Sequence, residues 1–529
     1  MPLSRRHALL AAGAAPAAWA QKRMLRRTDQ STPGGLCLNE DNSHYFYTRA
    51  GQKLDEAAVD SWVDQYAGTQ IRELLLCPNA MRTSYASSVW DPIWRGYDPK
   101  GPDDQPLLAS TPPASRPGAR RWIHTAWELH QAGIDVYARW IRRARQLGLS
   151  PWLSVRMNDV HNVDDERSFL HSEFWRQNPH LRRVPYRFTH WNDRAFDYGR
   201  TEVRAHHFRL IRELAERYDF DGLELDWMRF GYHFRPGQEA AGREILTAFT
   251  ADVRRLLDGW QQRRGHRIRL GARVPTRPAT ALGLGYDPVA WARRNLVDML
   301  VVTPFFSSSE TDIPIELWKQ LLDGARVTLA AGLEILVRPY PEFQSPLRNS
   351  LLTARAAASS FLERGADRVY LFNYMDSDTA MADLANYPTL LREAGSLGTL
   401  RGKPRRHILT FADTWAPGEP RASALPVACE PGRWYALRLA TGPQPAGGQA
   451  YIHLGLEGIN AEQLRQWELR LNGDICPYQG PAQVDAPKPE VPLVRFGIPL
   501  PSVNRGYNLV ELHAKHAARV VWAEIALDL

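Results

Sequence analysis

Two acidic residues in one short segment carry the clearest chemical signal of this sequence. The segment is Asp219–Arg229, which reads Asp-Phe-Asp-Gly-Leu-Glu-Leu-Asp-Trp-Met-Arg. Apolar and acidic residues alternate in it from Leu223 to Asp226. In a β-strand this alternation places Glu224 and Asp226 on one face and the leucines on the other. Two carboxylates on a buried face are costly unless they serve a purpose, and paired carboxyl groups suit acid–base chemistry. The alternative is a structural ion pair, in which Arg229 holds one acid ionised.

Other polar residues recur where apolar runs end. The run Ser150–Met157 is followed closely by Asn158, Asp159 and His161, whose donors and acceptors suit a hydroxyl-rich substrate. Asp159 and His161 are also metal-ligand types, but two ligands make a weak signal, and no metal site is predicted. The predicted substrate-binding residues are Glu40, Asn79, Arg82, Arg156, Asn158, Asp159, His161, Trp227, Arg229, Arg273, Asn373 and Tyr374.

Arginines recur at these same positions. They are Arg82, Arg156, Arg229, Arg273 and Arg338. A guanidinium group binds carboxylate or sulfate through two parallel hydrogen bonds, so the set suggests an acidic substrate. The alternative, slightly favoured, is that each arginine orients a neighbouring carboxylate of the protein.

A repeated β/α pattern positions these residues. Residues 35–376 alternate short apolar runs with amphipathic helical segments, several of which end at a glycine such as Gly265. We predict an α/β fold, a (β/α)8 TIM barrel, whose strand carboxyl ends build the active-site rim. A doubly wound open sheet is the alternative, but the sequence has no strand-linked GxGxxG phosphate loop. The predicted strands are Leu36–Asn39, Ile71–Cys77, Ser150–Met157, Gly222–Trp227, Ile268–Val274, Met299–Phe305, Leu329–Leu336 and Val369–Tyr374.

Two insertions and a change of pattern indicate the domain organisation. Residues 84–125 and 160–200 follow the second and third strands and are expected to wall a substrate cleft. After a Gly/Arg-rich stretch the helical pattern stops, and short alternating segments between Pro, Gly and Asn turns indicate a smaller antiparallel β-sandwich. We predict an export signal over 1–20, a catalytic barrel over 31–394, a linker over 395–406 and an accessory β-sandwich over 407–529.

The N-terminus is typical of an export signal. Arg5 and Arg6 precede an Ala/Leu-rich run, and Ala18-Trp19-Ala20 supplies the small residues that a signal peptidase reads. The arginine pair favours the twin-arginine route and a periplasmic or secreted location, with an ordinary Sec signal as the alternative. No later run reaches the roughly 18 apolar residues of a membrane span.

Composition excludes several classes of partner and site. The 529 residues carry a net charge of +8 without a long Lys/Arg block, which argues against a nucleic-acid-binding arm. Four cysteines show no CxxC zinc spacing, and both a Cys37–Cys77 bridge and buried free thiols are open interpretations. No cofactor is predicted.

One longer stretch resembles a known group of proteins. Ala195-Phe-Asp-Tyr-Gly-Arg-Thr-Glu-Val-Arg204, a helix and then Tyr218–Arg229 resemble the bacterial glycosyl-hydrolase-like (family ten-like) barrel proteins, which carry NPEVR…DGIELDxxR there. The similarity covers residues 35–390. It implies glycoside hydrolysis of a carbohydrate, with Asp226 as a main catalytic carboxylate and Arg229 beside it. Segments of the C-terminal part resemble β-sandwiches appended to glycosidases.

Glycoside hydrolysis takes two carboxyl groups, so Asp226 needs a partner. The fifth predicted strand contains no acid, whereas the seventh brings Glu334 to the barrel mouth. Glu334 is the first candidate, and Glu224, Asp159 and Glu310 are the others. The predicted catalytic residues are therefore Asp226, Glu334 and Glu224.

Together these patterns predict an exported glycoside hydrolase that cleaves a poly- or oligosaccharide, with the arginines hinting at an acidic glycan. A non-catalytic glycan-binding protein on a barrel scaffold is the alternative, favoured by the missing acid of the fifth strand. A metal-dependent deacetylase or esterase is a third interpretation, which would need bound metal.

The export interpretation has a direct test. Replacing Arg5 and Arg6 with lysine should abolish export of a tagged protein, because the twin-arginine route reads this pair. Fractionation of cells followed by immunoblotting measures the exported share. Continued export through the Sec channel would contradict the assignment.

Overall fold

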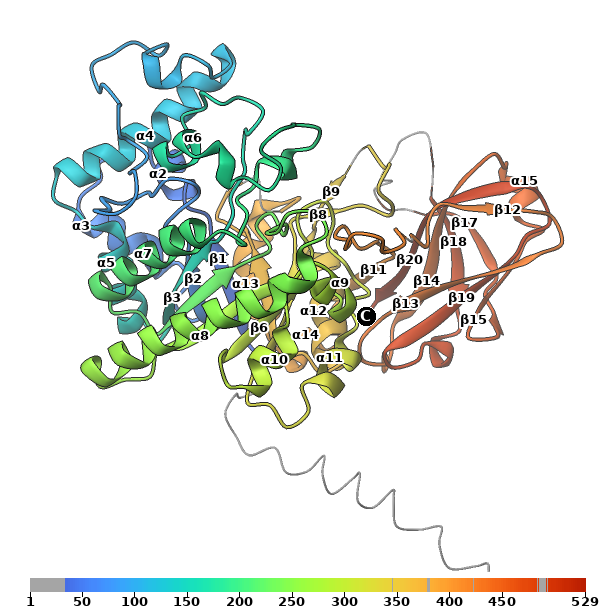
Figure 1. Cartoon of the computed structure of the whole chain (residues 1–529). Coiled ribbons are helices and arrows are strands. Elements are labelled where there is room, and N and C mark those ends of the chain that lie inside the picture. Colours follow the sequence, from blue (N-terminus) through green and yellow to red (C-terminus); the bar gives the residue numbers. More distant parts are fainter. Residues whose placement is uncertain are drawn as a thin grey trace, which may run out of the picture. The chain divides into compact units, whose positions relative to one another are not determined.

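A closed barrel of parallel strands forms the first part of the chain. The computed structural model describes residues 34–529 except 345, 378–380, 422, 483, 485–490 and 492, so the predicted export signal lies outside the described residues. The barrel strands are β1 (Leu36–Glu40), β2 (Ile71–Leu76), β3 (Ser150–Arg156), β4 (Gly222–Asp226), β5 (Arg269–Pro275), β6 (Met299–Thr303), β7 (Thr328–Leu333) and β10 (Arg368–Phe372). They close in the order β1-β10-β7-β6-β5-β4-β3-β2. Figure 1 labels β1, β2, β3 and β6 of this barrel. The predicted TIM barrel is confirmed, and the open sheet is wrong.

Helices between the strands cover the barrel. Several begin at a side-chain cap: Asp55, Asp135 and Ser350 each accept a backbone N–H three residues later. The longest helix ends at Gly265, whose φ of 73° matches the predicted C-cap. The helices are α2 (His44–Thr48), α3 (Glu56–Asp64), α4 (Arg116–Gln131), α5 (Val136–Gln146), α6 (Glu173–Gln177), α7 (Thr201–Arg217), α8 (Glu239–Arg264), α9 (Pro278–Gly283), α10 (Pro288–Arg293), α11 (Ile315–Leu321), α12 (Leu351–Glu363) and α13 (Tyr387–Glu393).

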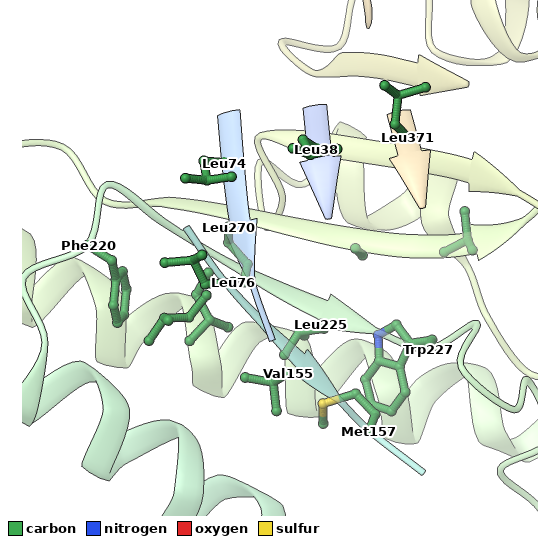
Figure 2. Packing of buried hydrophobic residues seen from close by; sticks show 14 of the residues in the cluster. Leu38, Leu74, Leu76, Val155, Met157, Phe220, Leu225, Trp227, Leu270 and Leu371 are labelled. Atoms are coloured by element: carbon green, nitrogen blue, oxygen red, sulfur yellow. The ribbon is translucent and has the colours of Figure 1, made fainter. Parts of the chain in front are cut away.

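The outward faces of the barrel strands form the main apolar core. Figure 2 shows Leu74 of β2, Val155 of β3, Leu225 of β4 and Leu270 of β5 in this layer, and all four are fully buried. Apolar residues on alternate positions leave the other face of each strand free to fill the lumen.

The lumen is filled rather than open. Apolar side chains from six strands pack there, among them Cys37, Trp152 and Tyr370. Glu73 closes the amino-terminal end of the lumen. It forms ion pairs with Arg269 of β5 and with Arg368 of β10, at 3.2 Å each. Charged lumen residues are thus paired at this end, away from the rim.

The seventh predicted strand is shorter than expected and is followed by a hairpin. β7 ends at Leu333, whereas the prediction extends to Leu336, and β8 (Leu336–Val337) pairs with β9 (Leu347–Arg348). The chain leaves the barrel ladder at Glu334, because side chains instead of a neighbouring strand bind the carbonyl group of that residue.

Two antiparallel sheets form the second part of the chain, as predicted for a β-sandwich. One sheet has the order β11-β20-β14-β18-β17 with β12 on β20, and the other has the order β13-β19-β15-β16. Residues 395–406, predicted as a linker, contain the short helix α14 (Leu397–Leu400) and the start of β11. The sandwich strands are β11 (Arg405–Ile408), β12 (Val427–Cys429), β13 (Trp434–Ala440), β14 (Gln449–Glu457), β15 (Glu468–Leu471), β16 (Asp474–Ile475), β17 (Tyr478–Pro481), β18 (Leu493–Ile498), β19 (Tyr507–His513) and β20 (Ala518–Asp528), with α15 (Ala461–Leu464) before β15.

The cysteines are buried free thiols, so the interpretation as a Cys37–Cys77 bridge is wrong. Among the residues that the structure describes, none of the helices has both the length and the apolar character needed to cross a bilayer.

Packing of the lumen around Gly222 can be tested by substitution. A Cβ atom at Gly222 would overlap the indole ring of Trp152, so Gly222→Ala should destabilise the protein by about 1–3 kcal/mol. Gly259→Ala is the matched control, because it lies within helix α8 with nothing within 4 Å of a Cβ and should stabilise the helix by roughly 0.5–1 kcal/mol. Urea unfolding measures both. Equal stability of Gly222→Ala and wild type would contradict the filled lumen.

Candidate active site

The alternating residues of β4 divide between the lumen and the helix layer. Glu224 Oε1 accepts hydrogen bonds from Ser154 Oγ of β3 (2.7 Å) and from the Tyr370 hydroxyl of β10 (2.8 Å). Leu225 packs on the outside, and Asp226 follows at the carboxyl end of the strand. Both carboxyl groups therefore lie in the lumen, as the alternation predicts, and they are 0% and 1% exposed.

Hydrogen-bond donors surround Asp226. Its Oδ1 accepts the backbone N–H groups of Met228 (3.1 Å) and Arg229 (2.9 Å), because the chain turns directly after β4. Its Oδ2 accepts from Nη1 of Arg273 on β5 at 2.8 Å. These three donors complement a negative charge on the carboxylate.

Arg273 joins Asp226 and Glu334, two of the three carboxyl groups that the sequence predicts to be catalytic. Its Nη2 lies 3.8 Å from Oε1 of Glu334, on the other side of the guanidinium from Asp226. The guanidinium carbon lies 3.7 Å from the ring centre of Phe372, and the side chain is 0% exposed. Burial, the largest single cause, lowers the pKa of Arg273, but Asp226, Tyr370, Glu224 and Glu334 together outweigh it, so the pKa is raised. Arg273 thus orients carboxylates, which is the alternative favoured for the strand-tip arginines.

The position of Glu334 is fixed through its backbone. Its carbonyl oxygen accepts hydrogen bonds from Ser309 Oγ (2.7 Å), Asn349 Nδ2 (2.6 Å) and the Tyr374 hydroxyl (2.9 Å). Tyr374, predicted to bind substrate, therefore positions Glu334 from beneath the rim.

The side chain of Glu334 differs from that of Asp226 in its surroundings. It is 1% exposed, and its Oε1 has no hydrogen-bond partner among the described residues. Burial raises the pKa of Glu334 well above its ordinary value, against the opposing charges of Arg273 and Arg229, and Asp226 raises it further. A carboxyl group with a raised pKa therefore lies across the guanidinium from a carboxyl group bound by three donors, and such a difference in surroundings is what acid–base catalysis uses.

Two further buried acids have raised pKa values. Burial, together with the nearby charge of Asp226, raises the pKa of Glu224 to about 7. Burial also raises the pKa of Glu310 to about 7, although Arg277 (2.7 Å) and the Thr276 hydroxyl (2.6 Å) oppose it. Glu224 lies below Asp226 in the lumen, whereas Glu310 lies at the rim beyond β6.

A charged network extends from the mouth to the surface. Arg156 forms ion pairs with Asp41 and, at 3.3 Å, with Asp159. His161 Nδ1 lies 2.8 Å from Asp159, and Arg229 Nη2 lies 2.7 Å from His161 Nε2. Because a guanidinium group only donates, Nε2 must accept, and the ring proton of His161 faces Asp159. Among the described residues, no cluster of three His, Cys, Asp or Glu side chains suits a metal ion.

The aromatic rim, which comprises Trp191, Phe230, Phe305 and Phe306, lies beside Arg229. Trp191 stacks on Phe305 with centroids 5.6 Å apart, and Phe230 lies 5.3 Å from Trp191. Phe230 has a left-handed backbone with φ of 70°, which is uncommon for a bulky residue. Trp191 and Phe306 are 36% and 39% exposed, so apolar ring surface is open to a ligand at this rim.

Several predicted binding residues lie away from this cluster. Glu40 lies on the helix side of β1, where its Oε1 is hydrogen-bonded to Nδ1 of His44, the first residue of α2, at 2.5 Å. Asn79 donates to the carbonyl group of Arg156 (3.0 Å), and Asn158 donates to that of Phe196 (3.0 Å) in the second insertion. The remaining two are buried elsewhere: Arg82 donates to carbonyl groups of both insertions, and Trp227 packs in the outer core (Figure 2).

Residues around β1 and β10 complete the mouth. Asn373 follows β10 with φ of 56°, and its Oδ1 has no hydrogen-bond partner in the described part of the chain. Asn39 is a lumen residue that the prediction missed: its strand neighbours Leu75 and Phe372 both face the lumen. Alternation from Cys37 could have identified it, since Asn39 shares that face and Glu40 does not.

Comparison with known proteins finds solved structures of similar fold. No protein-family model and no curated protein matches this chain. Its fold is similar to alpha-L-fucosidase isoenzyme 1 from Paenibacillus thiaminolyticus (12% identity, 90% of this chain and 95% of that chain, TM-score 0.34). It is also similar to the PgaB (BpsB) glycoside hydrolase domain from Bordetella bronchiseptica (11% identity, 69% and 99%, TM-score 0.41) and to the maltogenic alpha-amylase AmyB from Thermotoga neapolitana (12% identity, 89% and 98%, TM-score 0.37). These similar structures are glycoside hydrolases, but at such scores the likeness carries no conclusion about this chain's activity.

The burial of Glu224 predicts a pH-dependent stability. Its pKa is about 7 in the folded chain and about 4.3 when unfolded, so the proton stabilises the fold at low pH and this contribution is lost as pH rises between these values. Glu224→Gln lacks that titration. The difference in unfolding free energy between variant and wild type should therefore rise by about 3 kcal/mol from pH 4 to pH 8.

Urea unfolding across this pH range measures the difference. Glu524→Gln is a control of opposite sign: burial alone would raise the pKa of Glu524, but the hydrogen bond from His453 and the charge of Arg406 lower it. That contribution is present at neutral pH and lost on acidification, so Glu524→Gln should destabilise most at neutral pH. A pH-independent difference for Glu224→Gln would contradict the raised pKa.

Proposed function

We propose that this protein hydrolyses glycosidic bonds of a poly- or oligosaccharide at the carboxyl-terminal mouth of its barrel. One observation carries the proposal: Arg273 contacts both Asp226, which is bound by three donors, and Glu334, whose pKa burial raises. A pair of carboxyl groups with opposite protonation is what glycoside hydrolysis requires. The resemblance to the family ten-like barrel proteins points independently to Asp226.

The two carboxyl groups would divide the reaction between them. Glu334 donates its proton to the leaving glycosidic oxygen, which avoids an alkoxide leaving group. Asp226, as an anion, attacks the anomeric carbon or stabilises the positive charge that develops there, and a water molecule then bonds to that carbon and returns a proton to Glu334. Arg273 holds both groups in place and keeps negative charge on Asp226, so it acts as a positioning residue.

The surroundings of the mouth support a carbohydrate as substrate. Trp191 and Phe306 offer exposed ring surface for sugar stacking, and His161 offers a polar group beside Phe230 of the same rim. Arg156 and Arg273 are already paired with acids of the protein, so support for an acidic glycan rests on Arg229, beside the rim.

Location and accessory domain complete the proposal. An export signal over residues 1–20 would place the enzyme in the periplasm or outside the cell, where polysaccharides are accessible substrates. The β-sandwich is proposed to support the barrel rather than to bind glycan on its own.

A non-catalytic glycan-binding protein is the second candidate. It is favoured by the burial of Asp226 and Glu334, each only 1% exposed, and by the position of Arg273 on β5 where an acid would serve catalysis. Release of reducing sugar from a panel of polysaccharides distinguishes the two. A binding protein would migrate more slowly in glycan-containing gels but would release no oligosaccharides.

Substitution of the carboxyl pair tests the mechanism. Asp226→Asn preserves the size of the side chain but removes its charge, so it should lower turnover by several orders of magnitude. Such a loss is part of the roughly 8–23 kcal/mol by which enzymes lower the activation free energy. Glu334→Gln should be comparably damaging, and a substrate whose leaving group needs no proton should restore its activity. Reducing-sugar release on the active polysaccharide provides the measurement.

A carboxylate outside the lumen serves as the control. Glu213→Gln on α7 alters an acid that accepts a hydrogen bond from Tyr85 (2.7 Å) and should retain wild-type turnover. Near-wild-type turnover of a folded Asp226→Asn protein would refute the assignment. An intact Glu334→Gln enzyme would refute only the pairing and direct attention to Glu224, Asp159 and Glu310.

A further inference from the structure

The rim connection, residues 409–421 after β11, leaves the sandwich to contact loops of the barrel. Thr311, beyond β6, donates its backbone N–H to Thr410 Oγ1 at 3.0 Å. Thr280 of α9 donates its hydroxyl to both carboxylate oxygens of Glu419 at 2.9 Å. The connection is thus fastened to the barrel near both of its ends, after β5 and after β6.

Between these attachments, Asp413 binds the backbone of the loop that follows β6. Its Oδ1 accepts the N–H of Phe305, and its Oδ2 accepts the N–H groups of Phe306 and Ser307, all at 2.8 Å. Three consecutive N–H groups directed at one carboxylate form an anion-binding backbone nest. Asp413 is therefore a fixed negative charge built into the barrel rim by the sandwich.

The loop that Asp413 holds carries half of the aromatic rim. Phe305 stacks on Trp191 at 5.6 Å and contacts Phe230 at 5.4 Å. Phe306 lies beneath the guanidinium of Arg229, 5.5 Å from its ring centre. Loss of the Asp413 hydrogen bonds would free this loop and with it the surface that a sugar would contact.

The charge of Asp413 also acts on Glu334. Burial is the largest cause of the raised pKa of Glu334; Arg273 and Arg229 lower it, and Asp413 and Asp226 raise it. Arg273 lies on β5, and Arg229 lies in the turn after β4. Asp413 belongs to the rim connection and Asp226 to β4. Tyr374 also lies beside Glu334: its hydroxyl donates to the backbone carbonyl of Glu334 at 2.9 Å.

We propose that Asp413 is a positioning residue, supplied by the β-sandwich, that completes the reaction site of the barrel. It holds the 305–307 loop against Trp191 and Arg229, and its negative charge favours the protonated form of Glu334. The catalytic consequence rests on the proposed function, whereas the two physical effects do not.

The charge effect is measured without a substrate. Infrared difference spectra over a pH series report the carboxyl band of Glu334, identified as the band that Glu334→Gln removes. Asp413→Asn should shift the midpoint of this band to lower pH, because it removes a negative charge that raises the pKa of Glu334. Asp413→Glu should retain a midpoint close to wild type.

The positioning effect is measured by hydrogen exchange. In Asp413→Ala the amides of Phe305–Ser307 lose their acceptor, so exchange of a peptide covering 304–310 should accelerate at least about tenfold, while the barrel strands exchange as in wild type. Glu419→Gln is the matched control: it alters a carboxylate of the same connection that binds the Thr280 hydroxyl and should change neither the midpoint nor this exchange.

Two results would overturn the proposal. One is an Asp413→Asn protein whose Glu334 midpoint equals that of wild type. The other is unchanged exchange of 304–310 in Asp413→Ala. If both effects are present but wild type releases no sugar from any glycan, the proposed function fails and the positioning role stands. If wild type is active, the alkaline limb of its pH–rate profile should move with the infrared midpoint.

Discussion

The buried guanidinium of Arg273 is the interaction on which the rest of the site depends. A full charge with no exposed surface is stable only if acids and a ring face compensate for lost water, and Asp226, Glu334 and Phe372 do so here. Because Asp226 takes the closer hydrogen bond, Glu334 is left buried with weaker compensation, and its pKa is raised. A single arginine thus creates two different carboxyl groups from two similar ones.

The same demand explains how distant segments of the chain meet at the mouth. The strand ends supply Asp226 and Glu334, the insertion after β3 supplies His161 and Trp191, and the sandwich supplies Asp413. Each of these segments leaves regular structure at the rim and is held there by side chains that bind backbone groups. Rigid strands therefore set the chemistry, and loops that belong to other parts of the chain shape its surroundings.

The sequence could predict those features that follow from a regular period. Repeated β/α units predicted the barrel, and alternation on β4 predicted that Glu224 and Asp226 face the lumen. The same rule applied to β1 would have selected Asn39 in place of Glu40, which bonds on the helix side. Trp227 was also misplaced, because it follows Asp226 and turns outward into the core.

Other features have no local signal in the sequence. For Arg273 the sequence favoured the orientation of a neighbouring carboxylate over substrate binding, but its type and position do not reveal which two acids would engage it. Asp413 lies beyond the barrel in sequence, in an irregular segment, and only the folded chain brings it to Phe305. The end of β7 at Leu333 likewise depends on side chains that come from three separate loops.

Neutron diffraction from deuterium-exchanged crystals at neutral pH would test most directly the claim that the two carboxyl groups differ in protonation. The account predicts deuterium on the Glu334 carboxyl group and on the three donors that face Asp226, with none on the Asp226 carboxylate. Deuterium on Asp226, or a Glu334 carboxylate without it, would contradict the account.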